Sequence, residues 1–244
     1  MSTDLIVLLT VGVFAVAVLY SSVGHAGASG YIAVMSLLGL VPAVIKPTAL
    51  ALNILVASIA AWQFVRAGHF SWPVFWPFAL LAVPFAFLGG YIELPTQAFK
   101  AIVGVVLLYS AARFAVPPQA EKVATPAPLL PALAIGAGIG LLSGLTGTGG
   151  GIFLTPLLLL MGWARTKTAA AVSALFILLN SAAGLLGNFS STKALPDYLA
   201  PLLVAAAFGG WIGSRLGSRH MAPTAIKQLL AAVLLVAGLK LLLT

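Results

Sequence analysis

Long apolar segments constrain this chain more than any other feature of its sequence. Most of the segments are about 18–22 residues long, enough to cross a hydrocarbon core of about 30 Å as a helix. With 61% hydrophobic and 7% charged residues, the chain cannot build a water-facing surface around a core of this size. The sequence therefore predicts an all-α integral membrane protein. The segments are 4–23, 29–42, 48–66, 71–92 and 97–115, then 129–146, 150–162, 167–188, 196–217 and 224–243.

The basic residues do not indicate a nucleic-acid-binding protein, although the net charge is +8. The 12 Lys and Arg residues lie singly between apolar segments, as topology signals and lipid-headgroup contacts do. The chain has no Cys, which excludes disulfides and thiolate metal sites. It also lacks a Walker loop, so we expect no ATP hydrolysis on this chain, no cofactor and no metal.

Two halves of the chain resemble each other. Residues 1–115 and 129–244 each contain four long apolar segments and one short segment, joined by a polar, Pro-rich linker at 116–128. Leu88–Ile92 match Phe208–Ile212, Gly30 and Lys46 match Gly151 and Lys167, and Lys100 and Arg113 share the spacing of Lys227 and Lys240. A duplicated hydrophobic unit is typical of secondary transporters.

The distribution of positive charge favours an inverted repeat. If the short segments 29–42 and 150–162 are reversals, eight basic residues share one face, against four on the other. If each half instead crosses the membrane four times, seven basic residues lie on one face and five on the other, which is a weaker asymmetry. The positive-inside rule therefore places the linker in the cytoplasm and both termini outside. The larger set is Arg66, Arg113, Lys122, Arg165, Lys167, Arg215, Arg219 and Lys227, and the smaller is Lys46, Lys100, Lys193 and Lys240.

A glycine-rich break precedes each short segment, at residues 21–30 and 143–151. Non-helical backbone is tolerated at membrane depth only where protein or a wet cavity surrounds it. We therefore expect short, re-entrant helices that begin near Ser29 and Gly150, with amino ends suited to an anion. The alternative is that glycines only allow close helix packing, which we favour for Gly89, Gly90, Gly209, Gly210 and Gly213.

Polar residues in and near the two breaks are the candidate anion-binding groups. His25 is ionisable, and an ordinary histidine pKa of about 6.5 would permit proton coupling, although a neutral His could instead only hold the loop. Hydroxyls could bind an oxyanion or cap a helix, and capping is the role we expect for Ser29. Mid-helix amides could line a path or join helices. The candidates are Gly24, His25, Gly27, Ser29, Gly30, Asn53, Thr146, Gly147, Thr148, Gly149, Gly150, Gly151 and Asn180.

Lys46 and Lys167 occupy matching positions before the second long segment of each half. We expect both side chains to extend to opposite water interfaces. The alternative is that they line two vestibules and concentrate anions there.

The second break and the segment after it, GTGGGIFLTPLLLL at 147–160, together with the weaker copy GHAGASGYIAVMSLLG at 24–39, resemble the sulfite exporter TauE/SafE family. The resemblance covers nearly the whole chain, including the duplication and the linker. It implies an exporter or permease of sulfur-containing anions, such as sulfite and organosulfonates, in a bacterial cytoplasmic membrane.

Three functions remain open from the sequence. The first is a secondary transporter that binds a small anion near the midplane, coupled to a proton or another ion. The second is a passive anion channel. The third is an intramembrane serine hydrolase, because Gly27–Gly30 reads GxSG and a Ser can use a His base. Besides the anion, we expect membrane lipids as partners, and a homo-oligomer is left open.

Overall fold

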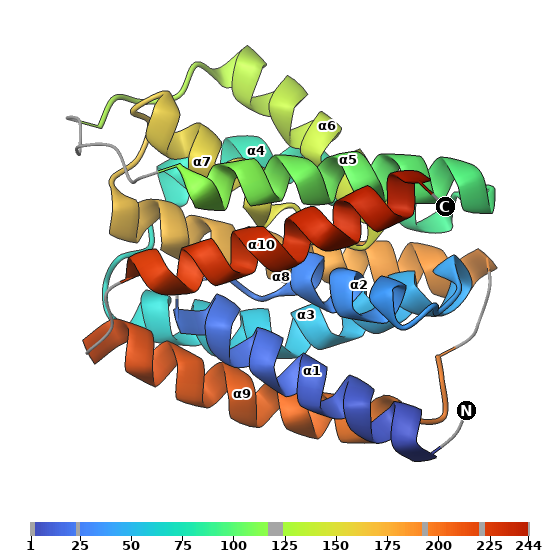
Figure 1. Cartoon of the computed structure of the whole chain (residues 1–244). Coiled ribbons are helices and arrows are strands. Elements are labelled where there is room, and N and C mark those ends of the chain that lie inside the picture. The colour runs from blue at the N-terminus through green and yellow to red at the C-terminus, as the bar shows by residue number, and fades with distance from the viewer. Residues whose placement is uncertain (1–2, 23–24, 117–123, 192–194, 220–222, 244) are drawn as a thin grey trace.

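A computed structural model describes residues 3–22, 25–116, 124–191, 195–219 and 223–243. Within these ranges the chain forms ten helices and no strand (Figure 1). The helices are α1 (Thr3–Ser22), α2 (Ala28–Leu37), α3 (Pro42–Arg66), α4 (Trp72–Tyr91), α5 (Thr96–Ala115), α6 (Leu129–Thr146), α7 (Gly151–Leu160), α8 (Thr166–Ser191), α9 (Leu199–Arg219) and α10 (Pro223–Leu243).

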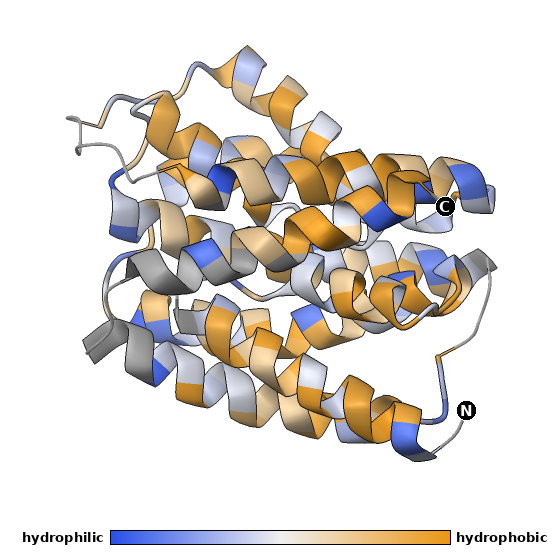
Figure 2. Ribbon diagram, in the orientation of Figure 1, coloured by the Kyte–Doolittle hydropathy of each residue, from blue (hydrophilic) through white to orange (hydrophobic). Residues whose placement is uncertain are grey.

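The predicted order of four long helices and one short helix in each half is confirmed. Five helices, α1, α3, α4, α6 and α8, are long and apolar enough to cross a membrane, and hydrophobic residues cover most of their length (Figure 2). The short helices α2 and α7 have 10 residues each, fewer than the predicted segments, and reach only about 15 Å. Helix α3 begins at Pro42, earlier than predicted, because proline is favoured in the first turn.

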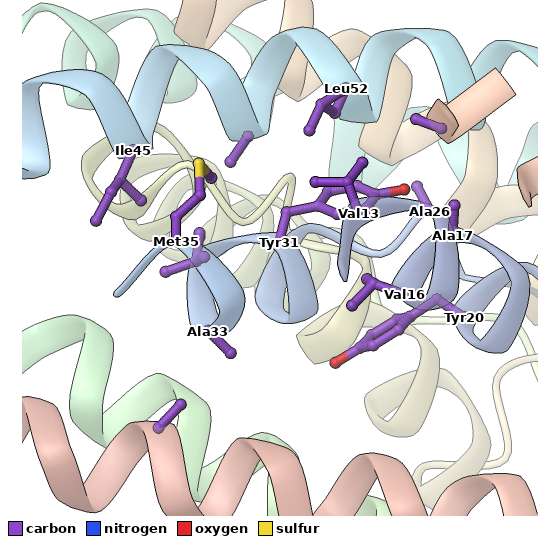
Figure 3. Close-up of a cluster of buried hydrophobic side chains, with 14 of the residues drawn as sticks. Val13, Val16, Ala17, Tyr20, Ala26, Tyr31, Ala33, Met35, Ile45 and Leu52 are labelled. Carbon is purple, nitrogen blue, oxygen red and sulfur yellow. The ribbon is translucent and has the colours of Figure 1, made fainter. Parts of the chain in front are cut away.

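The helices pack into two bundles that do not coincide with the two halves of the sequence. We call α1, α2, α3, α5, α9 and α10 the first bundle, because their buried side chains form one core (Figure 3). Helices α4, α6, α7 and α8 form the second bundle around another core. Helix α4 of the first half thus packs on α6 and α8, whereas α9 of the second half packs on α1 and α3. The first half therefore contributes α4 to the second bundle, and the second half contributes α9 and α10 to the first.

Helices matched between the halves run antiparallel where they meet. Along the contact between α3 and α8, Leu50 lies against Gly184, Asn53 bonds to Ser181, and Ala60 packs near Ala174. Helices α5 and α10 also pack on each other, and Figure 1 shows both chain termini at the same end of the molecule. An inverted repeat requires this arrangement, and the inversion itself stays a prediction from the sequence.

Glycines bring the backbones of neighbouring helices into contact. A Cβ atom on Gly140 or Gly144 of α6 would collide with the carbonyl oxygen of Ala82 or Ala86 on α4. Gly89 faces the backbone of α6 in the same way, and Gly213 faces that of α1. These contacts confirm the packing role predicted for the mid-helix glycines, since only a residue without a side chain permits so close an approach.

We predict that Gly144→Ala destabilises the protein by about 1–3 kcal/mol, because the added methyl group overpacks the contact between α4 and α6. Gly138→Ala is the matched control on the same helix, where a Cβ atom would meet nothing within 4 Å. Thermal unfolding of the purified variants in detergent measures the difference. Equal midpoints for the two variants would contradict this account of the packing.

Candidate functional site

A small hollow lies in the middle of the molecule, where the two glycine breaks meet. It is narrow and partly open to its surroundings. Asn53 and Ile177, near the midpoints of α3 and α8, place it halfway along the long helices. The breaks at both short helices contribute to its wall, so the two sequence halves share one site. Its lining residues are Tyr20, His25, Ala26, Gly27, Ala28, Ser29, Asn53, Thr148, Ile152 and Ile177.

The amino end of α2 faces this hollow without a side-chain cap. Gly27 is the N-cap residue, with a φ of +102° that favours glycine. Ser29, which we expected to cap the helix, instead lies within its first turn and shares a 2.8 Å hydrogen bond with the Tyr20 hydroxyl. The capping role predicted for Ser29 is therefore wrong. The first N–H groups of α2 have no acceptor within the helix and are directed toward its amino end.

The second break turns the chain back into the molecule in the same way. Gly147 ends α6 with a φ of +83°, and Gly150 is the N-cap of α7 with a φ of +81° and no side-chain cap. A Cβ atom on Gly149 would lie 2.6 Å from the Asn53 Nδ2 atom, and Gly151 packs directly against Ile177. The loop thus needs glycine both for its backbone angles and for its fit against α3 and α8.

The two threonines of this loop have unequal roles. The Thr146 hydroxyl donates to the Leu142 carbonyl oxygen at 2.6 Å and lies 3.0 Å from the Thr148 hydroxyl. Since a hydroxyl has a single hydrogen, Thr148 is the donor in this second bond. Thr146 therefore holds Thr148 in place without lining the hollow, whereas Thr148 lines it.

The two mid-helix amides also differ. Asn53 is fully buried, and its Nδ2 atom lies 3.4 Å from the Ser181 Oγ atom, whereas its Oδ1 atom has no partner. A rotation of the amide by half a turn exchanges the two ends, so Asn53 can offer a donor or an acceptor to a ligand. Asn180 is equally buried and has no hydrogen bond, but it does not line the hollow.

His25 is the only lining residue that is partly exposed, and it follows the carboxyl end of α1. Its backbone N–H donates to the Tyr20 carbonyl oxygen at 3.0 Å. Gly30 lies outside the lining, where it lets α2 approach the side chains of Val16 and Tyr20. Gly24 lies outside the described residues. The lining of the hollow is therefore most exposed at His25.

The electrostatics of the hollow suit a negative solute. None of its lining residues is acidic, and the amino end of a helix carries about half a positive charge. The amino end of α2 lines the hollow through Gly27, Ala28 and Ser29, and that of α7 borders it through Ile152. In the part of the chain that the structure describes, no cluster of three His, Cys, Asp or Glu residues could hold a metal ion.

Tyr20 and Ser181 are the site residues that the sequence did not single out. Tyr20 lines the hollow and bonds to Ser29, and Ser181 is the partner of Asn53. The position of Tyr20 directly before the first break was the available signal. Ser181 carried none, because a serine in a helix commonly bonds to the preceding turn.

Lys46 fits neither of the roles considered for it, whereas Lys167 is exposed as expected. The Lys46 side chain is only 6% exposed. Its Nζ atom donates to the carbonyl oxygens of Gly89, Gly90 and Ile92 at 3.0, 2.7 and 3.0 Å. Lys46 therefore caps the carboxyl end of α4, where a positive charge is favourable.

Comparisons with known proteins agree with the resemblance. The sequence matches the sulfite exporter TauE/SafE family over residues 8–241. It is 44% identical over 239 residues to the "Probable membrane transporter protein y4hK" of Sinorhizobium fredii, a match that covers 96% of this chain and 97% of the relative. No solved structure matches the chain. The chain is thus a multi-pass membrane transporter and not an enzyme, and it belongs to the TauE/SafE sulfite exporter family.

Proposed function

We propose that this transporter is a permease for small anions, with sulfite and organosulfonates as its best candidate substrates, and that it exports them. The anion binds in the hollow between α2 and α7. The observation that carries the proposal is the meeting of two uncapped helix amino ends at a hollow whose lining has no acidic residue. The choice of sulfur anions follows the name of the family.

Several groups would bind the anion together. In this proposal the N–H groups at the amino ends of α2 and α7 donate to the anion, and the Asn53 amide and the pair of Tyr20 and Ser29 add donors. When Tyr20 donates to Ser29, the hydrogen of Ser29 can turn to the ligand. Ile152 and Ile177 form an apolar wall beside these donors. Such a site accepts an oxyanion at its polar side and tolerates a small organic group at the other.

The proposal places the protein in the cytoplasmic membrane of a bacterium, with the linker at 116–128 in the cytoplasm. Basic residues at the carboxyl ends of α3 and α5 and at the amino end of α8 support this orientation. Family membership removes the hydrolase hypothesis, and Ser29 bonds to Tyr20.

Flux measurements in proteoliposomes test the proposed function. Purified protein should mediate saturable uptake of sulfite or a short organosulfonate that responds to an imposed proton or ion gradient. Flux that never saturates and ignores every gradient would identify a channel instead. Absence of flux for all the sulfur oxyanions, with flux for another solute class, would refute the proposed substrates.

We predict that Gly150→Ala lowers the transport efficiency, kcat/KM, by about tenfold, because an alanine at positive φ costs about 1–2 kcal/mol and turns the amino end of α7 away. A Cβ atom there would also lie 2.9 Å from Ile139 and 3.0 Å from Phe176. Gly39→Ala is the control, since Gly39 has a similar φ of +77° but lies in open space away from the hollow. Equal losses in both variants would show that backbone strain alone matters.

Asn53→Leu should weaken anion binding about tenfold to a hundredfold, because a hydrogen bond to a charged group is worth about 1.5–3 kcal/mol. Asn180→Leu is matched to it in burial and chemistry but lies outside the hollow, so it should leave the affinity unchanged. The affinity of each variant is obtained from the increase in its stability against unfolding as the anion concentration is raised. A larger loss in Asn180→Leu than in Asn53→Leu would contradict the assigned site.

His25 should make transport depend on pH, because an imidazolium beside the hollow attracts an anion and a neutral imidazole does not. With an organosulfonate, which stays ionised throughout, KM should rise between about pH 5 and 8. His25→Gln should flatten this rise. A pH profile that is the same in the variant would remove His25 from the mechanism.

A further inference from the structure

The charged side chain of Lys46 forms hydrogen bonds between the two bundles. Its three hydrogens are all used by the three carbonyl oxygens at the end of α4. Lys46 lies on α3, in the first bundle, whereas α4 belongs to the second. These bonds therefore join the bundles.

The contact between α3 and α8 is the seam along which the bundles meet, and its two ends differ. Near one end, Lys46 holds the carbonyl oxygens of α4. At the centre, the hollow separates the bundles and Asn53 bonds across it to Ser181. Toward the other end, Ala60 and Ala61 pack against Ala174, a contact without polar groups. Separating alanines costs only their small apolar contact, whereas separating Lys46 from α4 breaks three charge-assisted hydrogen bonds.

The most exposed residue of the hollow's lining lies toward the end of the seam away from Lys46. His25, its only partly exposed lining residue, follows the carboxyl end of α1. Helices α1 and α2 pack antiparallel, with Gly12 against Val34 and Tyr20 bonded to Ser29. The carboxyl end of α2 and the start of α3 therefore lie at the opposite face from His25. The partly exposed residue of the lining thus lies toward one face, and Lys46, which is buried, lies toward the other.

We propose that Lys46 is a positioning residue for transport. Its three bonds to the α4 carbonyl oxygens, which we call the clasp, keep the transporter closed at the membrane face where α3 begins. The clasp releases these oxygens when that face opens. This rests on the proposed function, in which the hollow is exposed to the two faces in turn. Lys46 is the fifth residue of α3, close enough to the membrane surface for water to reach the separated groups. Glu93, exposed and adjacent to Ile92, gives the released ammonium another partner.

Cysteine accessibility tests the clasp without requiring a known substrate. The chain has no Cys, so Ile177→Cys places a single thiol in the lining of the hollow. An impermeant thiol reagent is applied to each face of oriented vesicles. With Lys46 present, labelling should be faster from the His25 face. With Lys46→Met added, labelling from the Lys46 face should rise about tenfold or more.

Matched variants separate the clasp from general destabilisation. Lys167→Met removes the exposed, repeat-matched lysine and should leave labelling at both faces unchanged. Lys46→Arg keeps the charge and the donors, so it should restore slow labelling. If Lys46→Met does not fold, Lys46→Gln, whose amide keeps two N–H donors, should give an intermediate rise.

Unchanged labelling from the Lys46 face in a folded Lys46→Met or Lys46→Gln variant would overturn the clasp. A parallel rise in Lys167→Met would also overturn it. The labelling experiment tests the clasp without an anion, whereas the proposed anion function is tested by flux. Either proposal can therefore fail without the other. In the anion-transporting protein, Lys46→Met should change turnover while leaving the affinity measured from the His25 face unaltered. An equal change in both quantities would indicate a merely structural role.

Discussion

Two helices that begin inside the molecule impose the main constraint on this structure. In a hydrocarbon environment every backbone polar group needs a partner, yet the first N–H groups of a helix have none within it. Neither α2 nor α7 has a side-chain cap at its amino end. The surrounding long helices enclose a small hollow at these ends. In the proposed function, the anion supplies the partner that these N–H groups lack within their own helices.

The packing around this space depends on close backbone contact. Glycines let α4 approach α6 and let α9 approach α1, so α4 joins the bundle of the second half and α9 joins that of the first. The exchange leaves α3 and α8 facing each other along one seam. The hollow lies at the centre of that seam. In the proposed transport cycle, movement of one bundle against the other would expose it to either membrane face from this position.

The sequence predicted the features that depend on local chemistry. The ten helices followed from apolar length, and five of the candidate residues, His25, Gly27, Ser29, Asn53 and Thr148, line the hollow, while their binding of an anion stays a prediction. What it missed depends on tertiary contact. The partner of Ser29 is Tyr20 and that of Lys46 is the end of α4, and no spacing in the sequence indicates these pairs. Asn53 and Asn180 were indistinguishable as mid-helix amides, because only packing decides which one faces the hollow.

Locating a bound anion would test the central claim most directly. Selenite resembles sulfite in shape and charge, and its selenium atom can be located by anomalous scattering in crystals. The account predicts a selenium peak in the hollow, within hydrogen-bonding reach of the first turns of α2 and α7 and of Asn53. A peak confined to the exposed Lys and Arg side chains at the membrane faces, with an empty hollow at saturating selenite, would contradict it.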